Sequence, residues 1–233
     1  MLGFMILGAT GWHSAGWGSG SESGPPARHA KPVTAEEYRN IIQRFDGYDV
    51  ILKPDQQEPE WWAGAPSVVR DARGVFWLAC RMRDAVSPRG LRGYEIRILQ
   101  SEDGVRFQTA RRIPREAVPI PGFERPALVI DPRSGKFKLY ACGPCQGGAW
   151  SIIKFDDVED PARIDPASAR VVMAPYDKSF PRDTPPEGYK DPFIFHAEGR
   201  YHAYLIGQLR GTERIYHFIS EDGDQWQSAG RPY

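Results

Sequence analysis

Three stretches of the chain repeat one hydrophobic pattern. In each, a proline opens an apolar run, a turn with glycine or polar residues follows, and an aromatic-rich apolar run ends the stretch. Two short apolar runs around such a turn predict a β-hairpin. The three stretches are 65–78, 125–140 and 191–204. Their opening prolines, Pro66, Pro126 and Pro192, lie 60 and 66 residues apart, so the hairpins indicate an internal repeat.

A second motif follows the first and third hairpins. Ser-Glu-Asp-Gly occurs at 101–104 and 220–223, and an aromatic residue, Phe107 or Trp226, stands three positions after each glycine. Asp-Gly after a strand predicts a tight turn, over which the aromatic ring can pack. The middle repeat has a degenerate stretch, 155–160, at the matching place. Another apolar run precedes each of the three stretches, so every repeat is predicted to hold about four short strands.

Four antiparallel strands in a unit of this length are typical of a β-propeller blade. We therefore predict an all-β propeller with about three blades, in a single domain over 33–233 that follows a mobile leader, 1–32. The predicted repeats are about 60–115, 120–175 and 186–233. Only 36–45 shows a helical, amphipathic pattern. Because propellers close with four or more blades, we expect the domain to be incomplete at its C-terminus or closed by other means, and an open blade face would favour self-association.

Composition agrees with a fold of strands and turns. The 233 residues include 24 glycines and 21 prolines, and 12% are aromatic. Thirty Lys and Arg balance thirty Asp and Glu, which disfavours nucleic acid as a partner. The apolar start, 1–8, lacks the basic region of a signal peptide and the roughly 20 apolar residues of a membrane span. We expect no membrane partner and favour a cytoplasmic location slightly over a secreted one.

The cysteine pattern does not predict a redox or metal site. Cys80, Cys142 and Cys145 cannot form an even disulfide framework. Cys142-Gly-Pro-Cys145 has the letters of the thioredoxin active site, but that chemistry needs the first thiol at a helix N-terminus. A strand-like stretch, 149–155, follows instead, so we interpret the motif as a turn between strands. No second ligand pair has zinc spacing, and we expect neither a metal nor a cofactor.

Three short motifs resemble those of the five-bladed β-propeller glycoside hydrolases, the superfamily of arabinanases, xylosidases, invertases, levansucrases and mannoside phosphorylases. Residues 190–192, Lys-Asp-Pro, are similar to the Arg-Asp-Pro that opens a strand in these enzymes. Residues 124–128, Glu-Arg-Pro-Ala-Leu, are similar to the Glu-Cys-Pro-Asp-Leu of the invertases. Residues 62–68 look like the Trp-Ala-Pro-x-Val of the xylosidase branch. The resemblance covers about 60–233.

The resemblance implies glycoside hydrolysis at a central channel. Glu124 matches the acid/base of the invertases, and Asp191 matches an aspartate that stabilises the transition state or tunes the acid. Glycosidic cleavage uses two carboxylates that flank the bond. The first residues of the innermost strands converge on a propeller's channel, so Glu124 and Asp191 can meet around one sugar. In the simpler interpretation, Asp191 binds backbone N–H groups and Glu124 is a solvated carboxylate or an arginine partner.

The chain departs from the family pattern in two ways. Repeat one has Ala65 where repeat three has Asp191, although Glu60 lies close upstream. The order of the glutamate and aspartate motifs is also reversed relative to the invertases. The base or nucleophile is therefore not located by the motifs.

Five further residues are candidates for substrate binding. They are Trp62, Glu95, Arg81, Arg125 and Lys190. A tryptophan can stack on a sugar ring, and an arginine can hold a carboxylate or a sugar hydroxyl. Alternatively, Trp62 covers the core, and Arg81 and Arg83 face solvent rather than the channel mouth.

The leading hypothesis is a glycoside hydrolase, and the alternatives are a non-catalytic carbohydrate-binding propeller and a scaffold for protein partners. Carboxyl groups of Glu124 and Asp191 that point into one pocket, within about 5–10 Å, would favour hydrolysis. Carboxyl groups that face apart would favour binding alone. Aromatic residues on the rim, without a concave polar pocket, would favour the scaffold.

Overall fold

The structure is a computed structural model, and the chain divides into two compact units, 1–48 and 49–233. The described residues are 34–43, 47–145, 148–175, 187–230 and 232–233. The predicted leader, 1–32, lies outside them.

Helix α1 spans Ala35–Gln43 in the first unit, where the sequence predicts a helix. Thr34 and Glu37 form a capping box at its start. The Thr34 hydroxyl accepts a hydrogen bond from the Glu37 N–H at 3.2 Å, and the Glu37 carboxylate accepts one from the Thr34 N–H at 2.8 Å. Among the described residues, no helix has the length and hydrophobicity to cross a bilayer.

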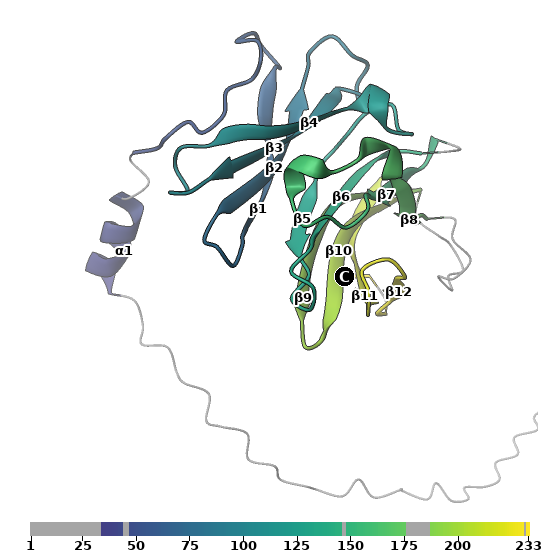
Figure 1. Ribbon diagram of the computed structural model, residues 1–233. Coiled ribbons are helices and arrows are strands. Elements are labelled where there is room, and N and C mark those ends of the chain that lie inside the picture. Colours follow the sequence, from purple (N-terminus) through teal and green to yellow (C-terminus); the bar gives the residue numbers. More distant parts are fainter. Residues whose placement is uncertain (1–33, 44–46, 146–147, 176–186, 231) are drawn as a thin grey trace, which may run out of the picture. The chain divides into compact units, whose positions relative to one another are not determined.

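The second unit contains three four-stranded antiparallel sheets, and each is a propeller blade (Figure 1). Blade 1 consists of β1 (Trp62–Arg70), β2 (Phe76–Arg83), β3 (Gly93–Ser101) and β4 (Gln108–Pro114). Blade 2 consists of β5 (Ala127–Ile130), β6 (Phe137–Pro144), β7 (Trp150–Lys154) and β8 (Arg170–Met173). Blade 3 consists of β9 (Gly188–Ala197), β10 (Arg200–Leu209), β11 (Thr212–Ser220) and β12 (Gln227–Ser228). Short 3₁₀ helices lie between strands at Arg115–Ala117, Pro161–Arg163 and Pro166–Ser168. The predicted all-β propeller blades are confirmed.

The first strands of the three blades face a common space. A cavity of about 470 Å³ is lined by residues of β1, β5 and β9, including Val68, Leu128 and Phe193. The innermost strands of a propeller line its central channel in this way. Residues that begin these strands therefore lie around the mouth of the channel.

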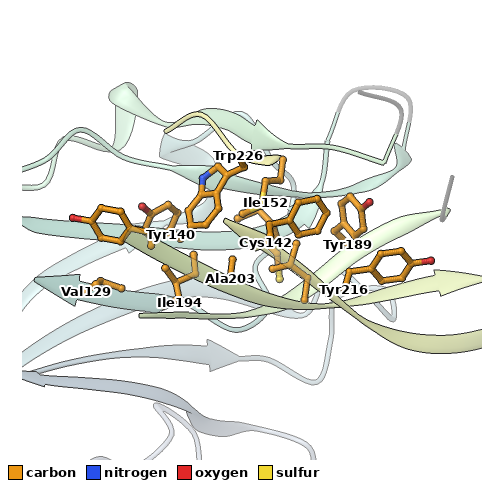
Figure 2. Close-up of a cluster of buried hydrophobic side chains, with 14 residues drawn as sticks. Val129, Tyr140, Cys142, Ile152, Tyr189, Ile194, Ala203, Tyr216 and Trp226 are labelled. Carbon is orange, nitrogen blue, oxygen red and sulfur yellow. The ribbon is translucent and has the colours of Figure 1, made fainter. Parts of the chain in front are cut away.

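Two apolar clusters join the blades. One packs side chains of blade 1, such as Trp77 and Ile98, against blade 2 residues such as Phe137. The other joins blade 2 to blade 3, and Figure 2 shows Tyr140 and Trp226 among its side chains. Burial of such large apolar side chains supplies most of the stabilisation of stacked sheets.

The two Ser-Glu-Asp-Gly motifs form the same turn in blades 1 and 3. The Ser101 hydroxyl accepts a hydrogen bond from the Gly104 N–H at 2.9 Å, and Ser220 accepts the equivalent bond from Gly223 at 2.8 Å. The Trp226 indole N–H then donates to the Gly223 carbonyl at 3.2 Å. The aromatic residue packs back over the turn in blade 3, as the sequence indicates.

The prolines that open blades 1 and 3 follow residues with left-handed backbone. Ala65 has φ 51° and Asp191 has φ 52°, and strand pairing shifts register beside both. Such a bulge bends the strand and re-aims the side chain at that position. A non-glycine residue at positive φ is strained, so the surrounding structure has to hold it there.

The Cys142-Gly-Pro-Cys145 motif is mainly strand rather than turn. Cys142 lies within β6, which continues to Pro144, and Cys145 begins the turn, closed by a 2.8 Å bond from Gly148 N–H to the Cys145 carbonyl. Both thiols are free. Burial raises the pKa of both, which disfavours the thiolate. Within the described part of the chain, no group of three or more His, Cys, Asp or Glu residues could hold a metal ion.

Candidate active site

Two cavities near the start of the inner strands share Glu124 and Asp191. The main cavity has a volume of about 640 Å³, and residues of all three blades line it. They include Arg83, Arg89, Glu124, Trp150, Lys190 and Asp191. The side cavity, of about 460 Å³, is lined by Arg81, Arg125 and Phe193 together with the two shared residues. The two acids that the sequence singled out therefore face common space.

Glu124 is held by the backbone between blades 1 and 2. Its N–H donates to the Cys142 carbonyl at 2.8 Å, and the preceding Phe123 N–H donates to the Gly93 carbonyl at 2.8 Å. A Cβ atom at Gly93 would lie 1.9 Å from the Phe123 carbonyl oxygen, and one at Gly143 only 2.2 Å from a neighbouring carbonyl oxygen. Glycine is needed at both positions for this close approach.

Arg81 connects the two acids electrostatically. Its guanidinium is buried and forms an ion pair with the Glu124 carboxylate, whose side chain is 29% exposed. Burial lowers the pKa of Arg81 and the charge of Arg83 adds to this, while the negative charge of Asp191 acts in the opposite direction. The buried Arg81 Nε has no hydrogen-bond partner among the described residues. Arg81 thus lies within electrostatic reach of both carboxylates.

Trp62 supports Arg81 rather than lining either cavity. The Arg81 guanidinium lies 4.6 Å from the centroid of the Trp62 ring, and that of Arg83 lies 5.9 Å from it. A Cβ atom at Gly64 would be 2.0 Å from the same ring, so glycine at this position lets the indole fold back over the strand. A cation over an aromatic face is attracted to it.

Asp191 takes its position from the bulge in β9. Its N–H donates to the Cys142 sulfur at 3.2 Å, and its left-handed backbone lies directly before Pro192. The charge of Asp191 adds to the effect of burial in raising the pKa of the Cys142 thiol. Cys142 is therefore a neutral packing partner of the site.

The other predicted binding residues separate into two groups. Lys190 lines the main cavity, with its ammonium 2.6 Å from the Glu213 carboxylate, and Arg125 lines the side cavity. Glu95 lies elsewhere: it is buried, and the Arg97 Nε lies 2.6 Å from its carboxylate. Because this ion pair already satisfies a buried charge, Glu95 is not part of the candidate site.

Several lining residues were not among those the sequence singled out for the site. They are Arg89, Arg92, Trp150, Glu187 and Gln208. Arg83, for which the sequence left open the channel mouth or solvent, lines the main cavity. Nothing local marks Trp150, which lies close to Gly90 of blade 1 and to Gly188 of blade 3.

No family model and no curated protein matches the sequence. Solved structures do match. A GH43 β-xylosidase/α-arabinofuranosidase from a compost microbial metagenome aligns with TM-score 0.54 and 12% identity over 80% of this chain and 62% of that one. Fructan 1-exohydrolase IIa from Cichorium intybus aligns with TM-score 0.52 and 15% identity, over 76% and 33%. Sucrose-6-phosphate hydrolase from Lactobacillus gasseri aligns with TM-score 0.51 and 19% identity, over 72% and 34%.

The chain spans between about a third and two thirds of the length of these structures. The matched proteins are glycoside hydrolases of the β-propeller type. With three antiparallel blades around a common space, this chain has the fold of the β-propeller glycoside hydrolases.

Proposed function

We propose that the protein acts on a carbohydrate at the mouth of the channel, by glycoside hydrolysis with Glu124 and Asp191. The observation that carries this proposal is that both carboxylates line the same two cavities, with a buried arginine paired to one of them. Glycoside hydrolysis needs two carboxyl groups around one bond. The fold shared with the GH43 β-xylosidase/α-arabinofuranosidase supports the proposal independently of the site residues.

The proposed roles follow from the contacts. Arg81 Nη1 contacts Oε2 of Glu124, which leaves Oε1 to exchange a proton with the glycosidic oxygen or a water molecule. The role proposed for Asp191 is to stabilise the positive charge that develops on the sugar ring in the oxocarbenium-like transition state. Glu187 is a third carboxylate of the main cavity, and it belongs in any test of the missing base or nucleophile.

The test is hydrolysis of a panel of aryl glycosides by the parent, Glu124→Gln and Asp191→Asn. On a substrate that the parent cleaves, each variant is expected to lose about 10²- to 10⁴-fold in rate, the usual contribution of a catalytic acid or base. Glu187→Gln reports on the third carboxylate. Glu102→Gln, on an exposed turn of blade 1, is the matched control and should retain the parent rate. Equal hydrolysis by all the proteins would remove these acids from the mechanism.

A carbohydrate-binding protein without catalysis is the second candidate. The ion pair with Arg81 favours it, because an arginine stabilises the ionised form of a carboxylate and an ionised group has no proton to donate. In that case, sugars would bind to the parent and to Glu124→Gln with similar affinity, and no glycoside of the panel would be cleaved.

A further inference from the structure

Two arginines of the main cavity have no acidic partner among the described residues. Lys190 lines the same cavity, but its charge is paired with Glu213. Among the residues that the structure describes, no carboxylate lies within ion-pair distance of Arg83 or Arg89. The cavity therefore holds two positive charges that are available to a ligand. Each guanidinium also presents five N–H donors.

The loop that carries Arg89 is held in place before any ligand binds. The Asp84 side chain, in a residue only 5% exposed, accepts a hydrogen bond from the Ser87 N–H at 2.7 Å and closes the loop between β2 and β3. Gly90 then turns with φ 89°, and a Cβ atom there would lie 3.6 Å from the Trp150 ring of blade 2. Such preorganisation reduces the entropy lost when a ligand binds.

Arg83 also lines the same cavity as the proposed acid/base, Glu124. It follows Arg81 by two residues on β2, so both side chains leave the same face of the strand, roughly 7 Å apart along it. Arg81 contacts Glu124. Arg83 and Glu124 both line the main cavity, so a group bound by Arg83 would share that cavity with the Glu124 carboxylate.

We infer that the sugar bound in the main cavity carries an anionic group, a carboxylate or a phosphate, and that Arg83 and Arg89 hold it. The planar guanidinium matches both anions, with two parallel hydrogen bonds to two oxygens. The described carboxylates of the cavity lie beyond ion-pair distance of both arginines, so a neutral sugar would leave both guanidinium groups without an ion-pair partner among the described residues. The identity of the ligand as a sugar rests on the proposed function, whereas the anion site rests on the two arginines alone.

The test measures binding of monosaccharides to the parent protein by calorimetry. Monosaccharides have no glycosidic bond, so hydrolysis does not interfere. The ligands are glucuronate, galacturonate, glucose 6-phosphate, galactose 6-phosphate, their neutral parents and inorganic phosphate. At least one anionic sugar should bind tenfold or more tightly than its neutral parent, and the uronates and the phosphates show which anion is preferred. Arg83→Gln and Arg89→Gln should each weaken that binding about tenfold or more, the loss expected for hydrogen bonds to a charged group, without affecting the neutral sugar.

One variant controls for the loss of charge. Arg106→Gln removes an arginine that lies on an exposed turn of blade 1, outside the cavity, and that is paired with Asp103. It should bind the anionic sugar within about threefold of the parent, since an exposed ion pair contributes little.

Three outcomes would overturn the inference: equal binding of charged and neutral sugars, a preference for anions that survives in both test variants, or no binding of any anion at tens of millimolar. Cleavage of neutral glycosides without a preference for anions would remove the anion site and leave the proposed function standing. A preference for anions without any hydrolysis would support the anion site and contradict the proposed hydrolysis.

Discussion

Blades 1 and 2 meet through apolar side chains and one ion pair, Arg81 with Glu124, whereas blades 2 and 3 meet through apolar side chains and a group of charges around the buried Lys154. In the first interface, the rings of Trp77 and Phe137 pack edge to face with centroids 5.7 Å apart. In the second, the ammonium of Lys154, a residue only 1% exposed, lies 2.9 Å from the Asp224 carboxylate. Hydrophobic contact tolerates small shifts, but a buried ammonium needs its partner at one place.

The difference arises within one repeated turn. Asp224 follows the glycine of the turn in blade 3, and Val105 holds the equivalent position in blade 1. Val105 is 49% exposed, while Asp224 reaches across to Lys154 of blade 2. The same backbone turn thus serves as a simple connection in one blade and as an interblade contact in another. The charged contact helps to set blade 3, which carries Asp191, against blade 2.

Lys154→Met should produce the largest change. It removes the ammonium shared by Asp224 and Asp157, which keep Arg170 and Lys138 as partners, so we expect a loss of about 1.5–3 kcal/mol of unfolding free energy, the range for hydrogen bonds to a charged group. Urea denaturation measures it. Lys136→Met, on an exposed turn of the same blade, should stay within about 0.5 kcal/mol of the parent. If both variants were equally stable, the charged interface would have no special role.

Phe137→Leu tests the apolar interface and should have a smaller effect. The change keeps an apolar side chain in the contact with Trp77, so we expect a loss of about 1–1.5 kcal/mol in the same urea experiment. A loss as large as that of Lys154→Met would show that the two interfaces are equally demanding.

The smallest expected effect is on the loss of stability in acid, which should differ slightly between the Ser-Glu-Asp-Gly turns of blades 1 and 3. Burial raises the pKa of Asp222, but hydrogen bonds from the N–H groups of Gln225 and Asp224 outweigh it, so this pKa lies below 3.8. Because the folded pKa is depressed, the ionised group stabilises the fold above its unfolded pKa, and this contribution is lost as the pH falls through the folded value. Asp222→Asn should therefore lose less stability than the parent between pH 6 and pH 3.

Asp103→Asn is the matched change in blade 1, where backbone hydrogen bonds from Arg106 and Val105 also lower the pKa of Asp103. It should reduce the acid response as well, but with a smaller loss at pH 7, because its turn makes no charged contact with blade 2 among the described ion pairs. An Asp222→Asn protein with the full acid response of the parent would contradict this assignment.

Much of the fold was predictable because its signals are local. A proline before an apolar run and a Ser-Glu-Asp-Gly turn act within a few residues, and the turns at Ser101 and Ser220 close with the same hydrogen bonds. The shared cavity of Glu124 and Asp191 agrees with their matching places in two repeats. Glu95 could not be judged in this way, because Arg97 joins it to Asp55, which lies far from both in the sequence.

The sequence by itself determined the strands, the turns and the repeat, since these depend on side-chain alternation and backbone preferences over short distances. Only the tertiary structure decided which charges are neutralised and which face open space. Arg81 meets Glu124 of the next blade, while Arg83, two residues further on, meets no carboxylate among the described residues. Ion pairing depends on distances between blades, and no short stretch of sequence encodes those distances.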